Sequence, residues 1–172
     1  MENRKLNRLP KYDYSHQGYY FVTVCTKDRK EWFGKIENGK MVLNECGSIV
    51  SQQWQWLAEQ YSFVQLDEFV VMPNHIHGII VIVGNARVGN GRDRSLRKIK
   101  SLSEVMGAFK TTSSKSIHLN GFPGFQWQKS FYDHIIRKDE SLDNVRVYIQ
   151  ENPMKWDLDQ ENIKNQKKRA IA

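Results

Sequence analysis

Residues 69–83 read Phe-Val-Val-Met-Pro-Asn-His-Ile-His-Gly-Ile-Ile-Val-Ile-Val, an apolar run that holds two histidines one residue apart. The Pro73-Asn74 dipeptide divides this run into two strands, because proline ends a strand and asparagine suits a tight turn. Side chains alternate between the two faces of a strand, so His75 and His77 are expected to project from one face while Ile76 projects from the other. Two imidazoles held in this way predict a metal-binding site.

Hydrophobic patterns along the rest of the chain predict the other elements. Strands are expected over 19–26, 63–72, 75–83 and within 126–137, and a turn over 34–40. Helices are expected over 44–60 with Asn44 as its cap, from Ser101 or Ser103 onward, and over 139–152. This order of elements is typical of the ferredoxin-like split βαβ fold, an α+β fold in which helices pack on one face of an antiparallel sheet.

The chain has 172 residues, of which 40% are hydrophobic, and this is enough for one domain with a substantial core. We expect that domain to occupy residues 1–156 and a basic tail to occupy residues 157–172. Lys and Arg total 26 against 19 Asp and Glu, which gives a formal net charge of +7. An excess of positive charge favours polyanionic partners, and nucleic acid is the leading candidate.

Two other classes of protein are disfavoured by the sequence. The N-terminal segment is charged and lacks the apolar core of a signal peptide, and no stretch approaches the ~18 apolar residues of a membrane span. Cys25 and Cys46 have neither the spacing of a metal site nor the number of a disulfide framework. We therefore expect a reduced, cytoplasmic protein that associates with the nucleoid and not with a membrane.

Residues 84–100 combine three glycines with six cations and a single acid. Such a segment is either a solvated loop or a loop that wraps a phosphate backbone, and the spacing of its glycines favours DNA contact. The residues expected to contact DNA are Arg87, Arg92, Arg94, Arg97, Lys98, Lys100, Lys110, His134 and Arg137.

Tyr148 and Asn152 lie four residues apart in the last predicted helix, so they are neighbours on one edge of it. Asn152 offers an amide oxygen to a metal held by His75 and His77, and Tyr148 places a phenol one turn away. Because two imidazoles and an amide carry no negative charge, the cation would keep its charge for a phosphodiester oxygen. A tyrosine beside such a cation is a candidate nucleophile that forms a covalent phosphotyrosine.

Three motifs, in this order, resemble the single-tyrosine HUH transposases of the REP-associated branch, in the IS200-like superfamily. They are Val-Met-Pro-Asn-His-Ile-His at 71–77, Trp-Gln-Lys-Ser-Phe-Tyr-Asp-His-Ile-Ile-Arg at 127–137 and Tyr-Ile-Gln-Glu-Asn-Pro at 148–153. The resemblance covers about residues 19–156.

The resemblance implies a ferredoxin-like domain of the HUH endonuclease type that binds Mg²⁺ or Mn²⁺. It implies a transposase, an endonuclease and strand transferase of DNA recombination that recognises palindromic hairpin repeats in single-stranded DNA. Cleavage and rejoining would pass through a 5′-phosphotyrosine, with Tyr148 in the place of the nucleophile. His75, His77 and Asn152 take the places of the metal ligands.

Several alternatives stay open at this point. Tyr132 is a rival nucleophile, because it lies next to an aspartate and a histidine. The chain is alternatively a non-catalytic binder of single-stranded DNA or RNA in which the histidines are structural, or a metal-dependent nuclease that uses water. The sequence leaves open a monomer or a homodimer, the DNA sequence recognised, the physiological metal and the general base.

Overall fold

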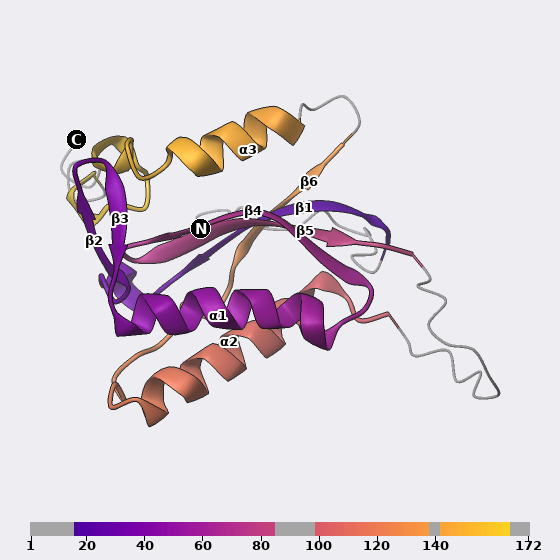
Figure 1. Cartoon of the computed structure of the whole chain (residues 1–172), viewed down its shortest axis with the longest axis horizontal. Helices are drawn as coiled ribbons and strands as arrows, with labels where there is room; N and C mark the ends of the chain where they lie inside the picture. The colour runs from indigo at the N-terminus through magenta and orange to yellow at the C-terminus, as the bar shows by residue number, and fades with distance from the viewer. Residues whose placement is uncertain (1–15, 85–98, 138–141, 166–172) are drawn as a thin grey trace, which may run out of the picture.

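A four-stranded antiparallel sheet with the order β4-β5-β1-β6 forms the centre of the computed structural model, which describes residues 16–84, 99–137 and 142–165. Its strands are β1 (Gly18–Cys25), β4 (Val64–Met72), β5 (His75–Ile82) and β6 (Tyr132–Ile136). Helix α1 (Glu45–Gln60) links β1 to β4, and α2 (Leu102–Leu119) lies between β5 and β6. This connectivity confirms the ferredoxin-like split βαβ fold (Figure 1).

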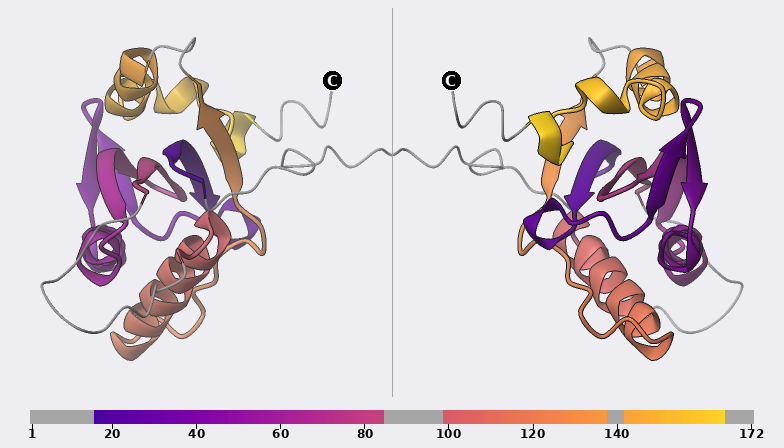
Figure 2. Two further views of the ribbon diagram at one scale, coloured as in Figure 1. Left: turned by 90° about the vertical axis from the view of Figure 1, so that its right-hand side faces the viewer. Right: turned by 90° about the vertical axis from the view of Figure 1, so that its left-hand side faces the viewer.

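Helices cover both faces of the sheet, and the expectation of a single covered face was wrong. Helices α1 and α2 lie on one face, and α3 (Leu142–Glu151) lies on the other (Figures 1 and 2). The apolar residues Leu142, Val145 and Ile149 of α3 form a cluster with Ile79, Val81 and Ile136 of the sheet. The reason is visible in β5, where all eight residues are buried and neither face is free to meet water.

The face of β5 that meets α1 is set by one close contact. Gly78 lies beneath the indole of Trp54, and an added Cβ at Gly78 would lie 2.4 Å from the Cζ2 atom of Trp54. Trp54 is fully buried and stacks on Phe69 with ring centroids 4.9 Å apart. A side chain at position 78 would therefore displace an indole that has no room to move.

Both long helices begin at the expected caps. The side chain of Asn44 accepts a hydrogen bond from the backbone N–H of Gly47 at the start of α1. Ser101 and Glu104 form a reciprocal capping box at the start of α2. Within the described residues, no helix has the length and apolar character needed to cross a membrane.

A β-hairpin occupies the region that was expected to be only a turn. Strands β2 (Gly34–Glu37) and β3 (Lys40–Leu43) pair with each other in a separate two-stranded sheet. Asn38 and Gly39 join them, both with positive φ angles of 50° and 73°. This is the backbone of a type I′ turn, and an Asn-Gly dipeptide is the usual sequence signal for it.

The described chain continues past α3 and folds back on the body of the domain. A short 3₁₀ helix, η2 (Trp156–Leu158), comes first. In the segment that follows it, side chains donate hydrogen bonds to backbone carbonyl oxygens, and one of these runs from Asn162 Nδ2 to the carbonyl oxygen of Trp156 at 3.0 Å. Its contacts with the body include the ion pair between Arg29 and Glu161, where Arg29 belongs to the 3₁₀ helix η1 (Lys27–Arg29). We propose that the domain extends to about residue 165 and that the basic tail begins after it.

The Gly78 contact makes a prediction about stability. Replacing Gly78 with Ala is expected to lower the free energy of unfolding by about 1–3 kcal/mol, because the Trp54 ring must be pushed aside. The matched control is Gly107→Ala in α2, where an added Cβ meets nothing within 4 Å. That change is expected to raise the free energy of unfolding by about 0.5–1 kcal/mol, since Ala is the better helix former. Urea unfolding of both variants measures the difference, and equal losses would contradict it.

Candidate active site

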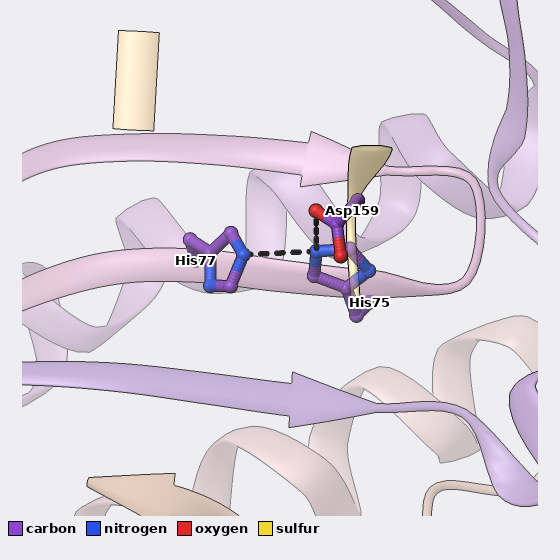
Figure 3. A group of neighbouring side chains, drawn as sticks. All are labelled: His75, His77 and Asp159. Atoms are coloured by element: carbon purple, nitrogen blue, oxygen red, sulfur yellow. Dashed lines mark hydrogen bonds and ion pairs between the residues drawn. The ribbon is translucent and has the colours of Figure 1, made fainter. Parts of the chain in front are cut away.

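The two histidines predicted to act together lie side by side on β5. The Nε2 atoms of His75 and His77 are 3.0 Å apart, and both side chains are buried (Figure 3). They project from the face of the sheet that α3 covers, together with Ile79 and Val81 of the same strand. Ile76 points to the opposite core, as the alternation of the strand requires.

A buried asparagine fixes which nitrogen of His75 carries the proton. Asn74 donates from Nδ2 to the carbonyl oxygens of Arg29 at 3.0 Å and Glu161 at 2.9 Å. Its Oδ1 therefore faces Nδ1 of His75 at 2.8 Å and accepts a hydrogen bond from it. This network assigns the proton to Nδ1 and leaves Nε2 of His75 as a bare electron-pair donor that faces His77.

The surroundings of His77 also hold its ring in place. Its Nδ1 lies 2.8 Å from the hydroxyl of Thr23, and its ring stacks on Phe21 with centroids 5.3 Å apart. Burial lowers the pKa of His77 to about 3. Burial, and then the neighbouring His77 and Arg29, lower the pKa of His75 well below its usual range. Both imidazoles are therefore neutral at physiological pH, which is the form that binds a metal ion.

Helix α3 brings Tyr148 to the same point. The Tyr148 hydroxyl lies 3.5 Å from Nε2 of His77, and the two rings have centroids 5.4 Å apart. Burial raises the pKa of Tyr148, the charge of Asp159 adds to this effect, and the amide of Asn152 opposes it. The phenol is thus held in its neutral form until some positive charge approaches it.

Asn152 is brought into the site by the last turn of α3. The residue is 3% exposed, and among the described residues its Oδ1 atom has no hydrogen-bond partner. Its amide lies near enough to Tyr148 and Asp159 to lower the pKa of each against the effect of burial. The sequence prediction placed Tyr148 and Asn152 beside the histidines, and the structure brings all four residues together.

One residue of the site was not predicted from the sequence. Asp159 lies with one carboxylate oxygen 3.7 Å from Nε2 of His75 (Figure 3). Burial raises its pKa, although the backbone N–H of Glu161 opposes this effect. The only signal in the sequence was an acid within the segment 157–172, which was expected to be a basic tail because most of its other charges are positive.

The residues present fit a divalent cation. His75, His77 and Asp159 offer ligand atoms that all lie within 4.8 Å of one another. Among the described residues, Oδ1 of Asn152 and Oδ2 of Asp159 are buried without hydrogen-bond partners. Buried oxygen atoms without hydrogen-bond partners are costly, and a cation beside them would remove that cost. Imidazole, amide and carboxylate donors suit small divalent cations, although they do not by themselves identify one.

The predicted DNA contacts are spread over the molecule, and they stay predictions. Outside the described residues lie Arg87, Arg92, Arg94, Arg97 and Lys98. His134 pairs in register with Phe21 and so lies on the same face of the sheet as the site. Lys100 lies over the ring of Tyr61, and Lys110 of α2 donates to the carbonyl oxygens of Gln128 and Lys129, both on the opposite face. Arg137 is exposed directly after β6.

The rival nucleophile lies on the same face as the site. Tyr132 pairs with Thr23, and Thr23 in turn pairs with His77, so the three residues form one row across β6, β1 and β5. Two strand spacings separate Tyr132 from His77 in this row, about 10 Å. Tyr132 is 58% exposed, whereas the Tyr148 hydroxyl touches His77 directly. The geometry thus favours Tyr148.

An ion pair fastens the tyrosine helix to the sheet. Arg146 of α3 donates to both carboxylate oxygens of Asp67, at 2.8 and 2.6 Å. Gln150, one turn later, donates to Glu68 at 2.8 Å. Asp67 and Glu68 lie at an irregularity of β4, where the register with β5 shifts between Leu66 and Phe69. These bonds fix α3, and therefore Tyr148, over the strand of the histidines.

The chain is similar in sequence to known proteins. No family model matches the chain. It is 36% identical over 168 residues to an uncharacterized protein of Haemophilus influenzae, covering 93% of each protein. It is 24% identical over 148 residues to the "Putative REP-associated tyrosine transposase" of the same organism, covering 83% of this chain and 74% of that protein.

A solved structure shares the fold. It is a REP-associated tyrosine transposase bound to a REP hairpin, with a TM-score of 0.57 and 20% sequence identity. The match covers 87% of this chain and 73% of that chain. At this level of identity, the likeness concerns the arrangement of helices and strands alone.

The buried histidines make the stability of the metal-free protein depend on pH. Below a pH of about 6.5 the unfolded chain binds protons that the folded, neutral imidazoles do not bind. The free energy of unfolding is therefore expected to decrease as the pH is lowered below about 6.5. The decrease is up to about 1.4 kcal/mol per pH unit for each histidine. Urea unfolding in a chelator between pH 7.5 and 5 measures this slope.

Substitution separates this effect from other titrating groups. His77→Gln is expected to show a shallower slope than the wild type, and His134→Gln, the same substitution at an exposed position, is the control. Asp159 contributes to the slope with the opposite sign, because a carboxyl group with a raised pKa stabilises the fold as the pH falls. The contribution of His77 is therefore taken from the difference in slope between variants. An unchanged slope in His77→Gln would disprove the neutral, buried state.

The ion pair on α3 predicts a local change in dynamics. Replacing Arg146 with Met removes the bidentate bond to Asp67 and is expected to loosen α3. Amide hydrogen exchange within α3 should then accelerate, while exchange in α1 stays as before. Lys155→Met, which removes the exposed pair with Glu151, is the control. Equal protection of α3 in both variants would show that packing alone holds the helix.

Proposed function

The chain belongs to the family of REP-associated tyrosine transposases, within the IS200-like superfamily, and on this premise we propose that it cleaves and rejoins single-stranded hairpin DNA through Tyr148. One observation carries the proposal, namely that the Tyr148 hydroxyl lies 3.5 Å from Nε2 of His77 within a buried group of neutral electron-pair donors. A phenol in this position has the neighbours that phosphodiester cleavage requires.

The proposed reaction exchanges one phosphodiester for another. The oxygen of Tyr148 attacks the phosphorus of the scissile linkage, the bond from phosphorus to the 3′ oxygen breaks, and the strand leaves with a 3′-hydroxyl. The phenolic proton is lost, the leaving oxygen gains a proton, and the 5′ end stays on the enzyme as a phosphotyrosine. A later attack by a 3′-hydroxyl reverses these bonds, so rejoining needs no external energy source.

The residues proposed to hold Mg²⁺ or Mn²⁺ are His75, His77 and Asn152. Such a cation supplies positive charge that polarises a phosphodiester oxygen and stabilises the charge that develops on it. The chain's own residues prepare the site, because Asn74 orients His75 and Thr23 contacts Nδ1 of His77. Phe21 packs against both His77 and Tyr148 and excludes water from one side of the nucleophile.

The proposed substrate is single-stranded DNA with palindromic hairpin repeats. The net charge of +7 supports a polyanionic partner, and a solved relative of the same fold is bound to a REP hairpin. His134, on the same face as the site, and the basic residues of 84–100 are the proposed contacts. We also propose that the chain acts within the nucleoid and that a monomer suffices, because one chain contributes both the histidines and the tyrosine.

The test is a covalent adduct on DNA. We expect Tyr148→Phe to abolish the adduct formed with an end-labelled single-stranded hairpin and Mn²⁺ or Mg²⁺, because only the attacking oxygen is lost. Hairpin binding should stay within about twofold, since one hydroxyl is a small part of an interface of phosphate contacts. Denaturing electrophoresis reads the adduct, and a gel-shift assay reads binding. Tyr132→Phe is the matched control and should retain the adduct.

Each of the other outcomes would indicate a different nucleophile or a different function. Loss of the adduct in Tyr132→Phe alone would transfer the role to Tyr132. Cleavage without an adduct in the wild type and both variants would indicate a nuclease that uses water. Binding without cleavage in the wild type would indicate a single-stranded nucleic-acid binder in which the histidines are structural.

A further inference from the structure

Asp159 reaches the histidines from outside the elements of the ferredoxin-like core. It follows η2, beyond the tyrosine helix, and its side chain is 4% exposed. Its Oδ1 accepts a hydrogen bond from the backbone N–H of Glu161 at 2.6 Å. Its Oδ2 lies 3.7 Å from Nε2 of His75 and, among the described residues, has no hydrogen-bond partner.

The position of Asp159 is tied to the position of His75. Asn74, which orients His75 through Nδ1, also donates to the backbone carbonyl oxygen of Glu161, two residues after Asp159. The carboxylate of Glu161 in turn pairs with Arg29, whose backbone carbonyl oxygen accepts the second bond from Asn74. One buried amide therefore sets the distance between the histidine and the aspartate.

Three electron-pair donors meet at this point. The bare Nε2 of His75 lies 3.0 Å from Nε2 of His77 and 3.7 Å from Oδ2 of Asp159. The positively charged side chain of Arg29 belongs to this network, but it forms an ion pair with the carboxylate of Glu161 and donates a hydrogen bond to the side chain of Gln128. A divalent cation at this point would supply the positive charge that the three donors share.

We propose that Asp159 is a direct ligand of the divalent cation, so that one carboxylate joins the two imidazoles and the Asn152 amide that are proposed to hold it. This proposal rests on the proposed function, which places a cation at His75 and His77. It changes the chemistry of the site, because the ligand set then carries one negative charge instead of none. A carboxylate also adds a hard oxygen donor, which small divalent cations such as Mg²⁺ and Mn²⁺ prefer.

The first test measures Mn²⁺ binding by the loss of the free-ion signal in electron paramagnetic resonance, without DNA. Asp159→Asn keeps an oxygen for the N–H of Glu161 and removes the charge. It is expected to weaken Mn²⁺ binding about tenfold or more, and Asp159→Ala is expected to weaken it further. Asp157→Asn is the control, because it makes the same change of charge at an exposed position two residues earlier and should bind as the wild type does.

The outcomes separate this proposal from the one on which it rests. If His75→Ala loses Mn²⁺ while Asp159→Asn binds within twofold of the wild type, Asp159 is not a ligand and the site of the proposed function stands. If the wild type itself binds no Mn²⁺, both proposals fail. Loss of binding in Asp159→Asn but not in Asp157→Asn supports the proposal.

A second variant tests whether residue 159 ligates the cation even if removal of the Asp159 charge disturbs the segment after η2. Asp159→Cys places a thiolate where the carboxylate lies, and thiolate ligation gives Co²⁺ an absorption band that nitrogen and oxygen ligands do not give. We expect this band in Asp159→Cys and not in Asp157→Cys or in the wild type. Both controls keep Cys25, which pairs in register with His75, so a band from that native thiol would appear in all three proteins. Cobalt bound through the histidines without the band would place residue 159 outside the coordination sphere and overturn the proposal.

Discussion

The alternation of side chains along β5 places the hydrophobic core on one face of the sheet and the histidine site on the other. Because successive side chains alternate, the strand sends Ile76 and Ile80 into the core beneath α1 and α2, and it sends His75 and His77 to the face of α3. A slip of one residue would exchange these sets and place two imidazoles in the apolar core. Gly78 prevents such a slip, since only a residue without a side chain fits beneath Trp54.

Burial gives the site its chemistry as well as its position. The same helix that covers the histidines also removes them from water, keeps them neutral and raises the pKa of Tyr148. A neutral imidazole binds a cation, and a neutral phenol does not attack until positive charge arrives beside it. The positive charge that we propose for this group would complete the ligand set and would also favour the phenolate of Tyr148.

Local signals predicted most of the fold, because they depend on neighbours in the chain. The cap at Asn44 and the turn at Pro73-Asn74 were predicted correctly, and Ser101 was one of two predicted caps for α2, since each of these signals depends on a few adjacent residues. The β2–β3 hairpin was missed although Asn38 and Gly39 carry its signal, and the expectation that the helices pack on one face of the sheet was wrong, because α3 covers the other face. That error concerned a long-range choice, because apolar residues on both faces of the central strands do not say which helix covers which.

The sequence by itself determined the paired histidines, the apolar strand that carries them and the spacing that places Tyr148 and Asn152 on one edge of a helix. These follow from the periods of strand and helix, which are properties of the local backbone. Only the tertiary structure decided that Asp159 joins them, and that Asn74 fixes the proton of His75 by bonding Arg29 and Glu161. Those contacts join residues 45 and 87 positions apart, and no local pattern specifies a hydrogen bond that forms only when the chain closes on itself.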